Sequence, residues 1–174
     1  MIRDIHELKA TLIRSGIAAE ADLAGCGAGE IEALERRYGV LPDSYRQILA
    51  LIGHGAGALV DDGEFWIYLD QIDRIPGEIQ AYLDEVRAEG GDLPPIPPNA
   101  FFISARYGEH PNYVLTGGGA DSVVYVFNYD DETVAKVFGS VWDWIEAFVQ
   151  DTQFFMALAA SRGHPLHREA GGQP

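Results

Sequence analysis

The chain has 174 residues, of which 47% are hydrophobic, so it can bury the core of a single domain. Its 27 Asp and Glu residues against 12 Lys and Arg give a formal net charge of -15. This charge argues against nucleic acid as a partner, because binding it requires Lys and Arg to neutralise phosphates. The acidity either serves solubility alone or suits a basic protein partner.

The sequence also predicts where the protein resides. Its one cysteine, Cys26, excludes an internal disulfide, which agrees with a reducing compartment. No apolar run approaches the roughly 20 residues that cross a bilayer. We therefore expect a soluble, cytoplasmic protein that makes no contact with a membrane.

Helical spacing of apolar residues dominates the first 57 residues. Helices are predicted over residues 2–14 and over residues 29–38, where Gly39 suits a helix end because glycine tolerates left-handed backbone. A third helix is predicted from Pro42 to Gly53, since proline fits the first turn. Its apolar residues recur at i, i+3, i+4 and i+7, which predicts a stripe buried against a sheet. The stripe consists of Tyr45, Ile48, Leu49 and Ile52.

From residue 58 onward, short segments rich in β-branched and aromatic residues alternate with turn residues, as is typical of strands. The connections between the later segments are short, which favours antiparallel hairpins. One predicted helix, at residues 77–91, interrupts this pattern. A second, at residues 141–160, follows a capping serine, Ser140, and closes it. Strands are predicted at residues 58–60, 65–69, 100–104, 112–115, 122–128 and 133–138.

Residues with metal-binding or catalytic chemistry do not form a complete set in the sequence. The glycine-rich stretch 117–121 lacks the Gly-Lys-Ser/Thr ending of a phosphate loop and is predicted to be a hairpin loop. His164 and His167 flank Pro165, which disfavours a helical metal site. Cys26 has no nearby histidine or lysine in the sequence. We therefore expect no metal, no cofactor and no catalytic residue.

The stretch "LERRYGVLPDSYRQILALIGHGAG" combines an acidic helix, Gly39, a Leu-Pro step, a tyrosine and a glycine-rich stop. This order resembles the signature of the SUKH superfamily, which includes fungal Smi/Knr-type cell-wall regulators and many bacterial immunity proteins. The stretches "FFISARYGEHPNYVLT", "SVVYVFNYDDE" and "GSVWDWIEAFVQD" resemble the strands and closing helix that follow in that family. The resemblance covers residues 28–152. One departure is Gly53-His54-Gly55, where the family usually carries Asn-Gly.

The resemblance implies an α+β fold, with helices packed on a curved, mainly antiparallel β-sheet. We expect one SUKH-like domain over residues 1–160 with an extra N-terminal helix, followed by a flexible tail over residues 161–174. For bacterial members it implies neutralisation of a toxin, often a nuclease, by direct binding and without a shared catalytic residue. We therefore expect a non-enzymatic immunity protein that binds a basic toxin. A regulatory or scaffold protein of the same fold, and an uncharacterised enzyme, are the alternatives.

The partner-binding surface is predicted from two acidic clusters at strand ends. If both strand ends face the same way, the clusters merge into one negative surface. Two aromatic residues share one face of the predicted strand 65–69 beside the first cluster and would supply buried contact area. Ordinary solvated turns are the competing interpretation, because Asp is favoured in turns. The predicted binding residues are Asp61, Asp62, Glu64, Trp66, Tyr68, Asp130, Asp131 and Glu132.

Overall fold

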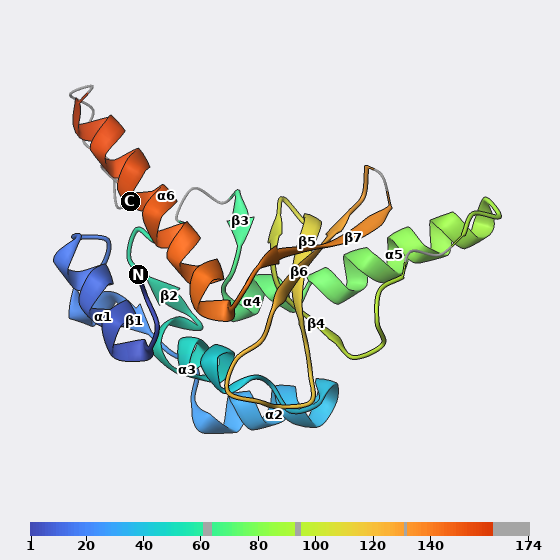
Figure 1. Cartoon of the computed structure of the whole chain (residues 1–174), viewed down its shortest axis with the longest axis horizontal. Coiled ribbons are helices and arrows are strands. Elements are labelled where there is room, and N and C mark those ends of the chain that lie inside the picture. The colour runs from blue at the N-terminus through green and yellow to red at the C-terminus, as the bar shows by residue number, and fades with distance from the viewer. Residues whose placement is uncertain (61–63, 93–94, 131, 162–174) are drawn as a thin grey trace, which may run out of the picture.

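A computed structural model describes residues 1–60, 64–92, 95–130 and 132–161 of the chain. It packs helices around a five-stranded antiparallel sheet, which confirms the expected α+β fold (Figure 1). The helices are α1 (Ile5–Arg14), α2 (Ala28–Tyr38), α3 (Asp43–Ile52), α4 (Leu69–Ile72), α5 (Ile75–Ala88) and α6 (Val141–Ser161), with a 3-10 turn at Glu20–Asp22. The strands are β1 (Leu23–Ala24), β2 (Gly55–Ala56), β3 (Phe65–Trp66), β4 (Ala100–Arg106), β5 (Glu109–Leu115), β6 (Val124–Asn128) and β7 (Thr133–Phe138).

The main sheet has the strand order β3-β4-β5-β6-β7, and every neighbouring pair is antiparallel. The last four strands follow one another in sequence, as the short predicted connections required. The register shifts in β4 on either side of Ser104, and again between β6 and β7 at Val124. Such irregularities bend strands, which agrees with the expected curvature of the sheet.

Helix α3 confirms the predicted core stripe. Tyr45, Ile48, Leu49 and Ile52 are each no more than 3% exposed. The Tyr45 ring packs on Phe101 of β4, with ring centroids 5.8 Å apart. The stripe therefore joins α3 to the sheet, as helical spacing predicted.

The start of α3 depends on the loop after β5. The backbone N–H groups of Asp43 and Ser44 donate to the carbonyl oxygens of Gly119 and Ala120, at 2.9 and 3.1 Å. These first N–H groups of a helix have no partner within the helix. The glycine-rich stretch is therefore a hairpin loop, as predicted, and it also satisfies the N-terminus of α3.

Asp121, at the end of the same loop, joins two helix starts. Its Oδ1 atom accepts hydrogen bonds from the hydroxyl of Ser44 in α3, at 2.7 Å, and from the N–H of Val141 in α6, at 3.0 Å. Ser140 caps α6 as predicted, because its hydroxyl accepts from the N–H of Asp143 at 3.0 Å. One carboxylate thus fixes how α3 and α6 begin.

One predicted strand is wrong, and another is shorter than expected. Residues 58–60 form a turn, and the strand in this region is β2, which pairs with β1 to make a separate two-stranded sheet. The predicted strand 65–69 ends at Trp66. The side-chain oxygen of Gln71 accepts from the N–H of Ile67 and of Tyr68, both at 3.3 Å, so the chain enters α4 instead.

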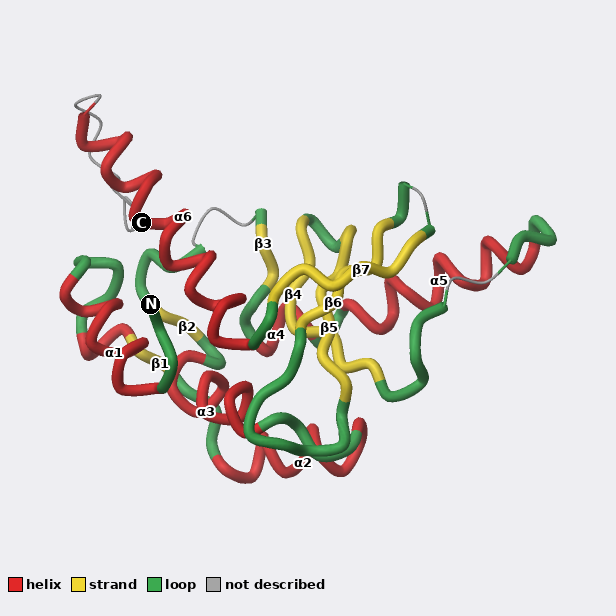
Figure 2. Tube along the Cα trace, viewed as in Figure 1, coloured by secondary structure: helices red, strands yellow, loops and turns green. Residues whose placement is uncertain are grey.

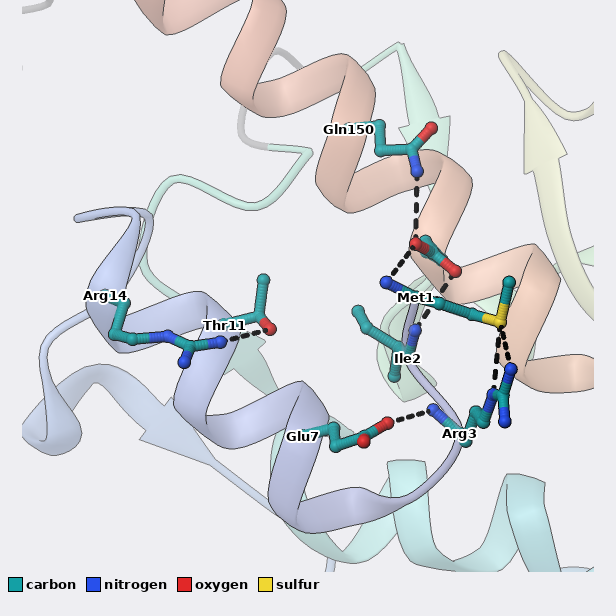
Figure 3. Close-up of polar contacts among 8 residues, drawn as sticks. Met1, Ile2, Arg3, Glu7, Thr11, Arg14 and Gln150 are labelled. Atoms are coloured by element: carbon teal, nitrogen blue, oxygen red, sulfur yellow. Dashed lines mark hydrogen bonds and ion pairs between the residues drawn. The ribbon is translucent and has the colours of Figure 1, made fainter.

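The N-terminal segment is bound to α6 (Figure 3). The N–H of Ile2 donates to Glu146 Oε2, and the Met1 amine lies beside Glu146 Oε1, both at 3.1 Å. These two contacts lower the pKa of the Glu146 carboxyl, the hydrogen bond from Ile2 contributing most. Helix α1 then starts at its cap, Asp4, whose carboxylate accepts from the N–H groups of residues 6 and 7.

Helix α6 has a buried half and an exposed half. Trp144 is 1% exposed and its indole N–H donates to the hydroxyl of Ser104 in β4, at 3.2 Å. The C-terminal part of α6 projects beyond the body of the protein (Figure 2), and its Phe154 and Phe155 are 64% and 60% exposed. Among the described helices, none is long and apolar enough to span a membrane. The predicted tail lies outside the described residues, apart from Ser161, which ends α6.

Candidate functional site

Four described acidic residues, Glu64, Glu109, Asp130 and Glu132, lie at one end of the five-stranded sheet. The start of β3, the turn from β4 to β5 and the end of β6 all lie at this end of the sheet (Figure 1). Neighbouring strands are about 4.8 Å apart, so β3 and β6 are separated by about 14 Å. We call this end the rim and define it as Glu64, Arg106, Tyr107, Glu109, His110, Asp130 and Glu132.

The β3 side of the rim holds a paired charge. Glu64 forms a salt bridge with Arg106, which lies opposite Phe65 in the strand register. The Arg106 guanidinium is 5.9 Å from the centre of the Phe65 ring. The carbonyl of Glu64 also accepts from the N–H of Tyr107 at 2.7 Å. Glu64 therefore holds the start of β3 against the turn between β4 and β5. Arg106 partly neutralises the charge of Glu64 in the free protein.

The centre of the rim presents a tyrosine to solvent. Tyr107 and Gly108 connect β4 to β5 with φ of 51° and 85°, as in the tight two-residue hairpins that match strand twist. A Cβ atom at Gly108 would lie 3.1 Å from the Trp66 ring, so the hairpin rests directly on that indole. Tyr107 itself is 64% exposed. The tight turn thus holds an aromatic ring outward at a fixed position.

The β6–β7 side of the rim is the more open one. Asp130 is 84% exposed and lies 3.9 Å from His110 Nε2. Glu132 accepts a hydrogen bond from the hydroxyl of Tyr82 in α5, at 3.0 Å. Tyr82 packs edge-on against Tyr129 with ring centroids 4.6 Å apart, and burial raises the pKa of Tyr129 to about 12. Glu132 is therefore anchored to the packed rings of Tyr82 and Tyr129, and both Asp130 and Glu132 remain exposed.

Backbone strain also concentrates at the rim. In the described part of the chain, four residues other than glycine have positive φ, and three of them are Tyr107, His110 and Glu132. This conformation is uncommon for side chains other than Asn, Asp and His, so at Tyr107 and Glu132 it persists only where the surroundings fix it. Such residues cluster at binding and switch sites, so the strain marks the rim as a candidate binding surface.

The predicted binding residues divide into three groups. Glu64, Asp130 and Glu132 do lie at the same end of the sheet, and Trp66 lies half-buried beneath the rim. Tyr68 does not share a strand face with Trp66, because it precedes α4 and its hydroxyl donates to the carbonyl of Leu59 at 2.6 Å. The residues that fall outside the described part of the chain are Asp61, Asp62 and Asp131.

The sequence prediction missed the middle of the rim. Tyr107, Glu109 and His110 all lie in the stretch "RYGEH". A two-residue Tyr-Gly turn between two strands was the available signal, since connections between strands run over the protein surface. The rim does not bring together three metal-ligating side chains among the residues that the structure describes, and the one such group lies elsewhere.

Comparison with known families agrees with this architecture. The SMI1/KNR4 family (SUKH-1) matches residues 25–147, which include all five strands of the main sheet and the whole rim. Helix α1 and the second half of α6 lie outside the match. No curated protein sequence matches the chain. Because the match spans well over half of the sequence, the chain belongs to the SMI1/KNR4 family (SUKH-1).

Proposed function

We propose that this protein is a non-enzymatic binding module of the immunity type, which neutralises a basic toxin of the nuclease class by binding it at the rim. The observation that carries the proposal is the exposed Tyr107, which is held by a tight two-residue turn at the same end of the sheet as the carboxylates of Glu109, Asp130 and Glu132. The net charge of -15 supports a basic partner.

The aromatic and the acidic residues of the rim would contribute to binding in different ways. Interface energy concentrates in a few buried aromatic or arginine anchors, so Tyr107 would enter a pocket on the toxin. Exposed carboxylates mainly speed encounter and select the partner. They would pair with Lys and Arg side chains that the toxin uses to hold phosphate. Neutralisation then follows from occlusion of the nucleic-acid site, and it requires no catalytic group on this protein.

Charge steering by the rim predicts that its neutralisation slows association. A rim variant with Glu109→Gln, Asp130→Asn and Glu132→Gln should bind the toxin with an on-rate about tenfold lower at low salt, because steering raises on-rates by roughly 10–1,000-fold. The off-rate should change less. Binding kinetics against the product of the adjacent gene, over a salt series, measure both rates.

A matched control separates rim charge from total charge. Glu32→Gln, Glu89→Gln and Asp92→Asn remove three exposed carboxylates from α2 and from the region at the far end of α5. At physiological salt this control variant should keep an on-rate within about twofold of wild type, since screening then limits charge effects to about 8 Å, and the rim variant should still associate more slowly than the control. Tyr107→Ala should instead raise the off-rate. Equal on-rates for the rim and control variants would refute the rim as the docking surface.

A further inference from the structure

Three side chains with metal-ligating atoms meet between α2 and α3. Cys26 follows β1, Glu30 lies in the first turn of α2, and His54 follows α3. The Cys26 sulfur, a Glu30 carboxylate oxygen and a His54 ring nitrogen all lie within 4.8 Å of one another. His54 Nε2 is 3.0 Å from Glu30 Oε1. Ligand atoms around tetrahedral zinc are about 3.3–3.7 Å apart, so shifts of about 1 Å would complete a coordination shell.

The backbone fixes the cysteine and the histidine on the same helix end. The N–H of Cys26 donates to the carbonyl of Leu49 at 2.8 Å, and the N–H of His54 donates to the carbonyl of Ala24 at 2.7 Å. A Cβ atom at Gly53 would lie 2.2 Å from the Cys26 sulfur, so only glycine leaves room for that sulfur. The two ligand-bearing segments are therefore held together before any ion binds.

The carboxylate is oriented as well. Glu30 Oε2 accepts the N–H of Gly27 at 2.7 Å, which leaves Oε1 facing His54. A second contact of this kind fixes a metal ligand in its binding orientation. Cys26 is 7% exposed, and within the described ranges its sulfur makes no hydrogen bond. This buried, polarisable sulfur thus lies within 4.8 Å of two other ligand atoms.

We propose that Cys26, Glu30 and His54 bind one zinc ion, with water in the fourth position. A thiolate, an imidazole and a carboxylate suit zinc, whereas Mg²⁺ and Ca²⁺ select oxygen ligands. The side chains of His54 and Glu30 are 39% and 49% exposed, which gives the ion an entry path. The bound ion would join the loop before α2 to the end of α3, on the side of the protein away from the rim (Figure 1).

One of the three proposed ligands stands where the sequence departs from the SUKH pattern. His54 lies between Gly53 and Gly55, where the resemblance to SUKH proteins leads one to expect Asn-Gly. The simpler alternative is an exposed Glu30–His54 ion pair beside a buried thiol. Only a zinc site would use the Cys26 sulfur as a ligand, so replacing that sulfur distinguishes a zinc site from an ion pair.

Zinc and cobalt binding to the full chain test the proposal. After treatment with a chelator, the protein should bind one equivalent of Zn²⁺ by calorimetry and melt several degrees higher with it, because a ligand of the folded state stabilises that state. Co²⁺ should give a thiolate-to-cobalt charge-transfer band. Cys26→Ser, Glu30→Gln and His54→Asn should each lower zinc affinity at least tenfold, and Cys26→Ser should abolish the band.

Control variants exclude zinc binding at other histidines. His6→Asn changes an exposed histidine on α1, and His164→Asn with His167→Asn removes the two histidines of the C-terminal stretch. Both variants should keep the affinity of the wild-type protein. If Cys26→Ser fails to fold, as judged by circular dichroism, then His54→Asn and Glu30→Gln decide the question. Absence of the cobalt band in the wild-type protein, or unchanged zinc affinity in His54→Asn, would overturn the proposal.

Discussion

Leu49→Ala should lower the free energy of unfolding by about 2–5 kcal/mol, as is usual when a buried leucine is truncated. Leu49 is 1% exposed at the centre of the α3 stripe, and its neighbours Tyr45 and Ile52 are equally enclosed. The loss combines the transfer free energy of the removed atoms with the cavity they leave. Urea unfolding followed by circular dichroism measures it as a shift in midpoint at constant slope.

Phe155→Ala is the matched control for this loss. Phe155 also lies on a helix but is 60% exposed, so its truncation should change stability by less than about 0.5 kcal/mol. A similar midpoint for Leu49→Ala and Phe155→Ala would show that α3 does not pack on the sheet as described.

Asp121→Ala should lower the free energy of unfolding by about 2–3 kcal/mol, because two helix starts lose one acceptor. The hydroxyl of Ser44, a fully buried residue, would lose its partner, and so would the N–H of Val141. Asp121 itself is exposed, so solvent screening limits the value of its charge. The same urea titration measures the effect.

Asp121→Asn separates hydrogen bonding from charge. The amide keeps one oxygen acceptor, so this variant should lose less than about 1 kcal/mol. A double-mutant cycle with Ser44→Ala isolates the contact between the two side chains, which should couple by at least about 0.5 kcal/mol. Additive losses would show that Asp121 and Ser44 stabilise the protein independently, contrary to the 2.7 Å contact between them.

Local sequence signals predicted the elements whose structure is decided locally. The α3 stripe follows from helical spacing, and strands β4 to β7 follow from short apolar segments joined by turns. The two-residue strands could not be predicted in this way. Strand β1 exists because Ala24 pairs with Gly55, a residue on the far side of two helices. Strand β3 ends early because the side chain of Gln71 accepts a hydrogen bond from the N–H of Tyr68, which caps the start of α4.

The same distinction applies to the two candidate sites. The strand ends with Glu64 and Glu132 could be read from the sequence, but their common end depends on the strand order in the sheet. Tyr107 was missed because a tight turn, rather than hydrophobic spacing, sets its exposure. Cys26 and His54 come together only after α3 has folded between them, so no spacing in the sequence indicates their contact.

The contact between the N-terminus and α6 has a consequence for how the chain is made. Ile2 and Glu146 are 144 positions apart, whereas β4 to β7 pair with their neighbours in sequence. Local pairings form quickly, and distant ones wait for the intervening chain. Ribosomes synthesise the N-terminal end first, so residues 1–14 emerge before the rest of the fold but remain without α6 until its first turns follow. Helix α1 packs on α3 early, but the contact between Ile2 and Glu146 closes only after the strands of the main sheet have been made.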